Sequence, residues 1–151
     1  MEYTLRRAER DDIPRIIALS AEELRSIAGA DASACYTAQD LERFFTKQDE
    51  WVCLAEVGGR VVGFLSIEVH REETDFLYLD DISVTAAYRN RGIGTALLGI
   101  AADYARQLRV PAVLLHVRKD NTAARRLYRR LGYAVLRDEG ERELMELEIR
   151  L

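Results

Sequence analysis

The sequence predicts an α/β (α+β) fold in which one mixed β-sheet carries helices on both faces. Two β-rich runs, 51–57 and 60–69, are joined by Gly58-Gly59, which is a strong hairpin signal. Further along, a nearly all-apolar run at 112–117 follows a long helical pattern, as expected for a strand–helix–strand crossover. An antiparallel hairpin followed by a parallel crossover indicates a mixed sheet.

Before the hairpin, the pattern predicts one short strand and one amphipathic helix. The strand covers 3–7. Asp11 and Asp12 then offer an N-cap, and Pro14 suits the first turn of a helix. Apolar side chains at helical spacing extend this helix to about Ile27.

A second, short helix is expected after an irregular stretch. Thr37 and Asp40 form a capping-box pair ahead of three apolar side chains, Leu41, Phe44 and Phe45. The stretch before it, 28–36, is long and irregular, and connections of this kind often carry function. We therefore regard 28–36 as a candidate functional loop.

The second half alternates strands with helices. A strand is predicted at 76–84, and a closing strand within 143–151 alternates apolar and charged residues. Asn121 is expected to cap the last helix, and Gly132 to end it in the left-handed conformation. The longest helix has its apolar face at Ile93, Ala96, Leu97, Ile100, Ala101, Tyr104, Ala105 and Leu108. The expected order is β-α-α-β-β-β-α-β-α-β-β, within a single domain spanning 1–151.

Composition excludes several classes of protein. A length of 151 residues with 48% apolar residues suits one folded domain, and the net charge of -4 makes no case for binding nucleic acid or an anionic membrane. No apolar run approaches the ~20 residues that span a bilayer, and the first residues do not resemble a signal peptide. Cys35 and Cys53 lack CxxC spacing, and His70 and His116 lie in no zinc-type cluster. We therefore expect a cytoplasmic protein without a metal site.

The segment from Val84 to Gly94 carries the most chemical information. A strand ends at Val84, and the turn Arg89-Asn90-Arg91-Gly92-Ile93-Gly94 leads into the longest helix. Glycines allow backbone to approach a ligand, and a helix start presents free N–H groups that favour an anion. A phosphate or pyrophosphate fits this site, while the alternative is a tight turn with merely solvated arginines. The pattern is neither G-x-G-x-x-G nor a P-loop, which disfavours a dinucleotide or ATP.

Two motifs are Arg89-x-x-Gly92-x-Gly94 and Asn121-x-x-Ala124-x-x-Leu127-Tyr128-x-x-Leu131-Gly132-Tyr133. The first resembles the acyl-CoA pyrophosphate loop of the GNAT superfamily of N-acetyltransferases, and the second is similar to the second motif of that family. The resemblance implies transfer of an acetyl group from acetyl-CoA to a primary amine by direct attack. It implies cofactor contacts at Ile82, Ser83, Val84, Arg89, Asn90, Arg91, Gly92, Ile93, Gly94, Thr95, Asn121 and Arg125.

The resemblance also implies where the cofactor's arm lies. The sheet would open between the strand ending at Val84 and the strand at 112–117, and the pantetheine arm would pair with the backbone at 82–84. Backbone groups freed by the opening need partners, and an amide-bearing arm supplies them. A backbone N–H there is expected to polarise the thioester carbonyl.

The resemblance implies a chemical role for three side chains, and each of them also has a purely structural explanation. Tyr128 matches the general acid that protonates the leaving thiolate, but it also lies on an apolar helical stripe. Asn121 would contact the pantetheine or the attached phosphates while capping its helix. Arg125 is a candidate for the nucleotide 3′-phosphate, although arginines on a helix are usually a solvated face.

The general base is left open between two patterns. Tyr78, Asp80 and Ile82 alternate onto one face of their strand, and family members often carry an acidic residue near Asp80. His116 interrupts an otherwise apolar strand, and certain protein N-terminal acetyltransferases keep a His and a Tyr at positions like His116 and Tyr78. Either pattern could deprotonate the amine, directly or through water.

The sequence says little about the acceptor and the oligomeric state. The irregular stretch 28–36 is a candidate acceptor loop. The acidic stretch containing Glu72, Glu73 and Asp75 favours a cationic amine, on a small molecule or on a peptide or protein. A homodimer stays open. Two other classes also stay open: a non-catalytic acyl-CoA sensor, and a nucleotide-binding regulator. Stabilisation by ATP but not acetyl-CoA would favour the last.

Overall fold

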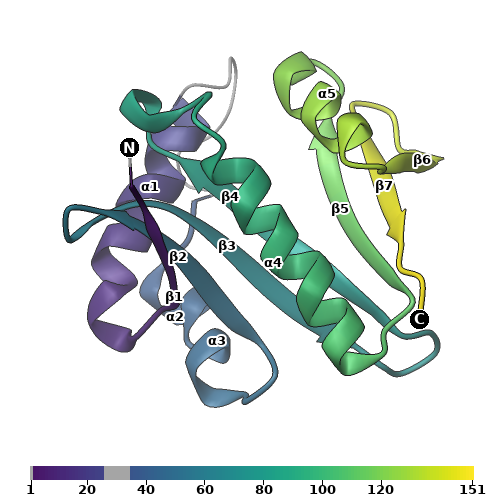
Figure 1. Ribbon diagram of the computed structural model, residues 1–151, viewed down its shortest axis with the longest axis horizontal. Coiled ribbons are helices and arrows are strands. Elements are labelled where there is room, and N and C mark those ends of the chain that lie inside the picture. The colour runs from purple at the N-terminus through teal and green to yellow at the C-terminus, as the bar shows by residue number, and fades with distance from the viewer. Residues whose placement is uncertain (1, 26–34) are drawn as a thin grey trace. The chain divides into compact units, whose positions relative to one another are not determined.

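The computed structural model describes residues 2–25 and 35–151 (Figure 1). The elements follow the predicted order of strands and helices, except that the second predicted helix is divided into two short segments. In chain order they are β1 Thr4–Arg7, η1 Arg10–Asp12, α1 Ile13–Arg25, α2 Ala38–Leu41, α3 Arg43–Thr46, β2 Trp51–Val57, β3 Arg60–His70, β4 Phe76–Val84, η3 Ala86–Tyr88, α4 Ile93–Leu108, β5 Ala112–Arg118, α5 Thr122–Arg130, β6 Ala134–Asp138 and β7 Arg142–Glu148.

The strands form one mixed sheet, as predicted. Its hydrogen-bonded order is β1-β2-β3-β4-β5-β7-β6. β4 pairs with β5 in parallel, while β1 with β2, β2 with β3, β5 with β7 and β6 with β7 are antiparallel. The hairpin between β2 and β3 turns at Gly58 and Gly59, whose φ angles are +58° and +80°. Both values favour glycine, and for this reason the Gly58-Gly59 pair predicted the hairpin.

The chain divides into two compact parts. The first comprises Met1–Ile67 with Asp81–Leu97, and the second comprises Glu68–Asp80 with Leu98–Leu151.

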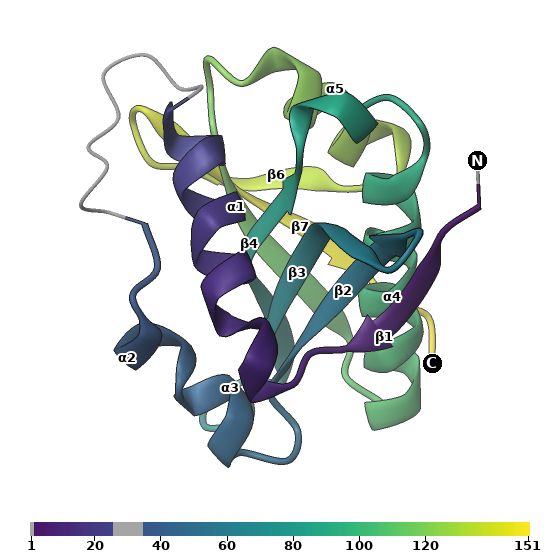
Figure 2. The same cartoon turned by 90° about the vertical axis from the view of Figure 1, so that its left-hand side faces the viewer.

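In the first part, α1 lies across β2 and β3 (Figure 2). Its apolar face buries Ile16 and Leu19 in one cluster with Leu54 and Phe64 of the strands. Gly63, the neighbour of Phe64, faces the other way, since a Cβ built on it would lie 3.6 Å from Ile93 of α4. Helical residues therefore cover both faces of β3 within this part.

The start of α1 differs from the expected cap. A 3₁₀ turn begins at Arg10, before the predicted cap at Asp11 and Asp12, and Asp12 accepts the backbone N–H of Glu9 at 2.8 Å. Arg6 of β1 donates to both oxygens of Asp12, at 2.8 and 2.9 Å. This ion pair holds Asp12 against β1, so its carboxylate anchors the turn to the sheet. The predicted end of the helix at Ile27, and most of the candidate acceptor loop at 28–36, lie outside the described residues.

In the second part, local signals hold α5 in place. The side-chain Oδ1 of Asn121 accepts the N–H of Ala124 at 3.2 Å, which confirms the predicted cap. Gly132 has φ +102° and donates its N–H to the carbonyl of Arg129. That conformation closes the helix as predicted.

Within the described ranges, no helix combines the length and apolar character needed to cross a membrane.

Candidate active site

The predicted phosphate loop lies in the first part of the chain. β4 ends at Val84, and the loop leads into α4 with Asn90 at φ +61° and Gly92 at φ +84°. Gly92 accepts the N–H of Ala96 at 3.0 Å, so the first turn of α4 closes directly after the loop. Only glycine adopts such a φ without strain, and asparagine tolerates it better than most residues. The sequence pattern thus reflects a backbone requirement.

The charges of this loop suit an anion. The α4 helix is sixteen residues long and has no acidic residue in its first turn, so its N–H groups and dipole are not opposed there. Arg91 stacks over the ring of Tyr88 at 5.5 Å. Arg89 donates its Nε to the carbonyl of Val84 at 2.9 Å, which holds its guanidinium beside the strand end. These features suit an anion, such as the phosphate or pyrophosphate that the sequence predicts here.

Two carboxylates of α1 reach the end of β4. The hydroxyl of Ser83 donates to the carbonyl of Leu19 at 3.2 Å and to Glu23 at 3.1 Å. The hydroxyl of Thr85 donates to Glu22 at 2.9 Å. The second oxygen of Glu22 is buried with no hydrogen-bond partner. Ser83 was expected here only through its backbone, and neither carboxylate was expected, because nothing in the α1 pattern distinguishes them from solvated residues.

Burial raises the pKa of Glu23, while the hydroxyl of Ser83 and the charge of Arg89 oppose that rise. The guanidinium of Arg89 lies 4.0 Å from the Glu23 carboxylate. Arg89 is thus shared between the phosphate loop and α1.

The register of β4 with β5 is short. Its pairs run from Leu77 with Val113 to Leu79 with Leu115. β4 nevertheless continues to Val84, and β5 continues to Arg118.

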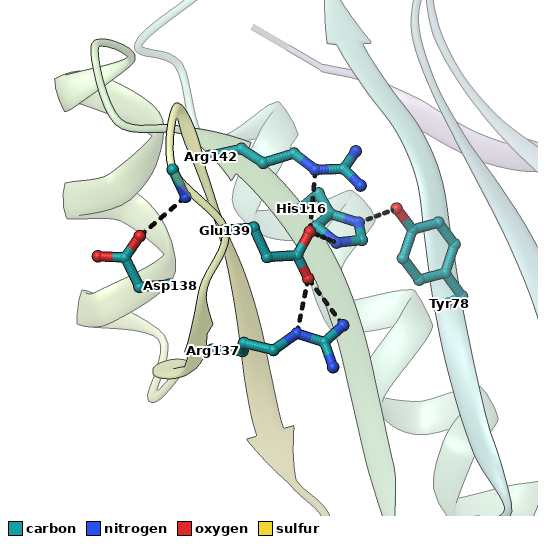
Figure 3. Close-up of polar contacts among 7 residues, drawn as sticks. Tyr78, His116, Arg137, Asp138, Glu139 and Arg142 are labelled. Carbon is teal, nitrogen blue, oxygen red and sulfur yellow. Dashed lines mark hydrogen bonds and ion pairs between the residues drawn. The ribbon is translucent and has the colours of Figure 1, made fainter.

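The predicted base candidates Tyr78 and His116 are in contact in the second part of the chain. The hydroxyl of Tyr78 lies 2.5 Å from His116 Nδ1, and the rings meet edge to face with centroids 5.5 Å apart (Figure 3). The other ring nitrogen of His116, Nε2, lies 3.1 Å from Oε1 of Glu139. A hydrogen-bonded chain therefore runs from Tyr78 through His116 to Glu139. Glu139 was not expected, since it lies in a turn 23 residues from His116.

Burial is the main cause that raises the pKa of Tyr78 to about 12, and the negative charge of Asp80 adds to it. Tyr78 is therefore protonated at neutral pH and is a hydrogen-bond donor. Asp80 is half-buried and influences Tyr78 through its charge.

Tyr128 is buried against Tyr133, with ring centroids 5.7 Å apart. The hydroxyl of Tyr133 is buried without a hydrogen-bond partner, and burial raises its pKa. Packing therefore accounts for part of the Tyr128 environment, as its helical stripe allowed.

Arg125 donates its Nε to Glu143 at 3.0 Å and an Nη to the carbonyl of Lys119 at 3.2 Å. These bonds give Arg125 a structural role beside its predicted phosphate contact.

Among residues 2–25 and 35–151, no three His, Cys, Asp or Glu side chains gather as a metal site would require.

Comparison with known proteins identifies the class. The fold is that of solved acetyltransferases: the PaiA N-acetyltransferase of Thermoplasma acidophilum, in complex with coenzyme A, superposes with a TM-score of 0.86 at 17% identity, covering 98% of this chain and 99% of the other. The ribosomal-protein-S18-alanine N-acetyltransferase of Escherichia coli superposes with a TM-score of 0.76 at 22% identity, covering 99% and 96%. An uncharacterised N-acetyltransferase of Methanocaldococcus jannaschii is 30% identical over 138 residues, which are 87% of this chain and 60% of that relative.

The model of the acetyltransferase (GNAT) family matches residues 13–133, and the chain belongs to this family. The resemblance seen in the sequence motifs is confirmed. The chain spans less than two thirds of the length of the Methanocaldococcus relative.

Proposed function

We propose that this protein is an acetyl-CoA-dependent N-acetyltransferase that transfers the acetyl group to a primary amine by direct attack. The observation that carries the proposal is the loop before α4. There, two left-handed residues, Asn90 and Gly92, lead into a helix start flanked by Arg89 and Arg91. This arrangement suits the pyrophosphate of coenzyme A.

The remaining cofactor contacts follow from the family match. The pantetheine arm would pair with the backbone of Ile82, Ser83 and Val84, at the end of β4. Asn121 and Arg125 would reach the pantetheine and nucleotide phosphates. For Arg125 this requires the guanidinium nitrogen that neither Glu143 nor Lys119 engages.

The chemistry needs a base and an acid. An alkyl ammonium has no lone pair, so the attacking nitrogen must lose a proton before it forms a bond to the thioester carbon. We assign this proton to the contact of Tyr78 with His116, because a hydroxyl and an imidazole nitrogen 2.5 Å apart can pass a proton between them. Asp80, which influences Tyr78 by its charge, stands as the alternative base. Tyr128 would protonate the departing thiolate.

The charges near Tyr78 favour a cationic acceptor. Glu68, Asp80 and Glu139 each disfavour ionisation of Tyr78 through their negative charge, and Arg142 alone opposes them. An ammonium group is attracted to such a surface. The acceptor class is therefore a primary amine that is protonated in solution, on a small molecule or at a peptide N-terminus.

Calorimetry with coenzyme A tests the first half of the proposal, and thiol release from acetyl-CoA with a panel of amines tests the second. Arg91→Gln should weaken coenzyme A binding several-fold, because it removes a charge at the helix start. The matched control is Arg106→Gln, which removes the same charge from the last turn of the same helix.

The outcomes separate the competing functions. Failure of the folded protein to bind millimolar coenzyme A would overturn the assignment. Binding without turnover on any amine would instead indicate an acyl-CoA sensor.

A further inference from the structure

We propose that Glu139, in the turn between β6 and β7, is a positioning residue that sets the tautomer of His116 and holds the charge that His116 gains during catalysis. The inference rests on the proposed function, because it assigns the direction in which the Tyr78–His116 contact moves a proton. Figure 3 shows the residues involved.

Both oxygens of Glu139 are engaged by donors. Oε1 lies 3.1 Å from Nε2 of His116 and accepts from Nε of Arg142 at 3.1 Å. Oε2 accepts from Nε and Nη2 of Arg137, at 2.9 and 2.8 Å. Arg137 is the largest cause that lowers the pKa of Glu139 to about 2, and the contact with His116 adds to it. The carboxylate is therefore ionised at neutral pH and can only accept hydrogen bonds.

An ionised carboxylate fixes the proton of the neutral imidazole. Because Glu139 can only accept, Nε2 of His116 must be the nitrogen that carries hydrogen. The lone pair of the ring is then on Nδ1, which faces the hydroxyl of Tyr78. The hydroxyl donates to Nδ1, and Nε2 donates to the carboxylate.

The turn itself holds the Glu139 backbone. The backbone N–H of Glu139 donates to the carbonyl of Arg142 at 2.9 Å. The next residue, Gly140, has φ +86° and donates its N–H to Oδ1 of Asp138 at 2.9 Å. The side chain of Glu139 is only 18% exposed, although the turn lies at the surface. These hydrogen bonds fix the backbone of the turn, and the carboxylate of Glu139 is held in a defined position.

This arrangement allows a proton to pass from the acceptor ammonium through Tyr78 to His116. The N–H bond of the acceptor ammonium breaks, its electron pair stays on nitrogen, and the proton goes to the oxygen of Tyr78, directly or through water. In the same step, Tyr78 passes its own proton to Nδ1 of His116. Tyr78 remains neutral, and His116 becomes an imidazolium beside the Glu139 carboxylate.

Neighbouring charges from each packed element bear on this step. Glu68 of β3 and Asp80 of β4 disfavour a tyrosinate at Tyr78, which favours a shuttle over an ionised base. His70 also meets the ring of Tyr78 edge to face and pairs with Glu68.

Two arginines, Arg137 and Arg142, also contact the Glu139 carboxylate. However, the side chains of Arg137 and Arg142 are 66% and 54% exposed, against 20% for His116 and 18% for Glu139. Solvent therefore screens the arginine charges more than it screens the contact of His116 with Glu139. We conclude that the two arginines orient the Glu139 carboxylate, and that this carboxylate sets the tautomer of His116.

The test compares Glu139→Gln and Glu139→Asp with Glu141→Gln. The control removes the same charge from the same turn, at an exposed residue. NMR of the imidazole nitrogens reads the tautomer directly in the full chain without substrates, and His70→Asn identifies the signals of His116. We expect hydrogen on Nε2 in the unaltered protein and in Glu141→Gln. We expect a mixture of tautomers in Glu139→Gln, since a neutral amide can also donate.

The kinetic test uses acetyl-CoA and an active amine. Glu139→Gln should lower kcat on the order of 10-fold, below the ~10²–10⁴-fold effect of a general base, while KM for acetyl-CoA stays unchanged. Glu139→Asp should recover part of the loss, because it restores the charge at a shorter reach.

The outcomes separate this inference from the proposed function. Hydrogen on Nδ1 in the unaltered protein, or an unchanged kcat in Glu139→Gln, would overturn the role of Glu139. If no amine is acetylated, the proposed function fails, and the NMR result still decides whether Glu139 sets the tautomer.

Discussion

Replacing Gly92 with alanine tests the backbone requirement of the phosphate loop. Gly92 has φ +84°, and a Cβ built on it meets no atom within 4 Å. Steric contact therefore contributes nothing, and the whole cost is the left-handed backbone, about 1–2 kcal/mol for a residue with a Cβ. We expect Gly92→Ala to lower the free energy of unfolding by that amount.

The chain offers a control of opposite sign. Gly99 lies in the middle of α4, is exposed, has no positive φ and would also place a Cβ in open space. Alanine there should raise the free energy of unfolding by roughly 0.5–1 kcal/mol, because glycine is a poor helix residue.

Urea denaturation followed by far-ultraviolet circular dichroism measures both variants. We expect the free energies of unfolding of the two alanine variants to differ by roughly 1.5–3 kcal/mol, the sum of the two effects. A Gly92→Ala protein as stable as the unaltered one would refute the backbone argument. So would a Gly99→Ala protein that loses stability.

Three further predictions follow from buried or paired groups. Tyr128→Phe should slow acetyl transfer by about 10–100-fold, which is at the low end for loss of a general acid because a thiolate leaves readily. The affinity for coenzyme A, measured by calorimetry, should stay unchanged. An unchanged rate would remove Tyr128 from the mechanism. The hydrogen bonds of Arg6 lower the pKa of Asp12, so the stability that this pair contributes should be present above the unfolded pKa of about 4 and be lost as the pH falls through the folded pKa. The stability of Asp12→Asn should therefore depend less on acid pH than that of the unaltered protein. An equal dependence would contradict the pairing. Burial raises the pKa of Cys53 to about 11, so its thiol should resist iodoacetamide at neutral pH until the protein unfolds; rapid labelling of the native protein, located by mass spectrometry, would count against its burial.

Local patterns predicted the elements whose determinants are local. Gly58-Gly59, the Thr37–Asp40 capping box and the Asn121 cap each occupy the expected position, because each satisfies a backbone group within a few residues. α1 begins at Ile13, directly after the predicted cap residues, but a 3₁₀ turn that was not predicted precedes it. There the capping carboxylate of Asp12 is also engaged by Arg6 of β1, and a partner in a neighbouring strand leaves no mark in the helical pattern.

The same distinction between local and long-range determinants applies to the candidate site. The sequence by itself determined the glycine turn before α4, since glycine at a positive φ and a helix start are properties of consecutive residues. It also nominated His116, because an imidazole interrupts an apolar strand, and the family resemblance added Tyr78 beside it.

Only the tertiary structure decided which partners these groups have. The parallel pairing of β4 with β5 places Tyr78 against His116, 38 residues apart, and the turn after β6 brings Glu139 to the other ring nitrogen. Likewise, Glu22 and Glu23 of α1 meet Thr85 and Ser83 across more than 50 residues of sequence. The tautomer of a histidine depends on the donor or acceptor at each nitrogen, and folding alone brings those groups within hydrogen-bonding distance.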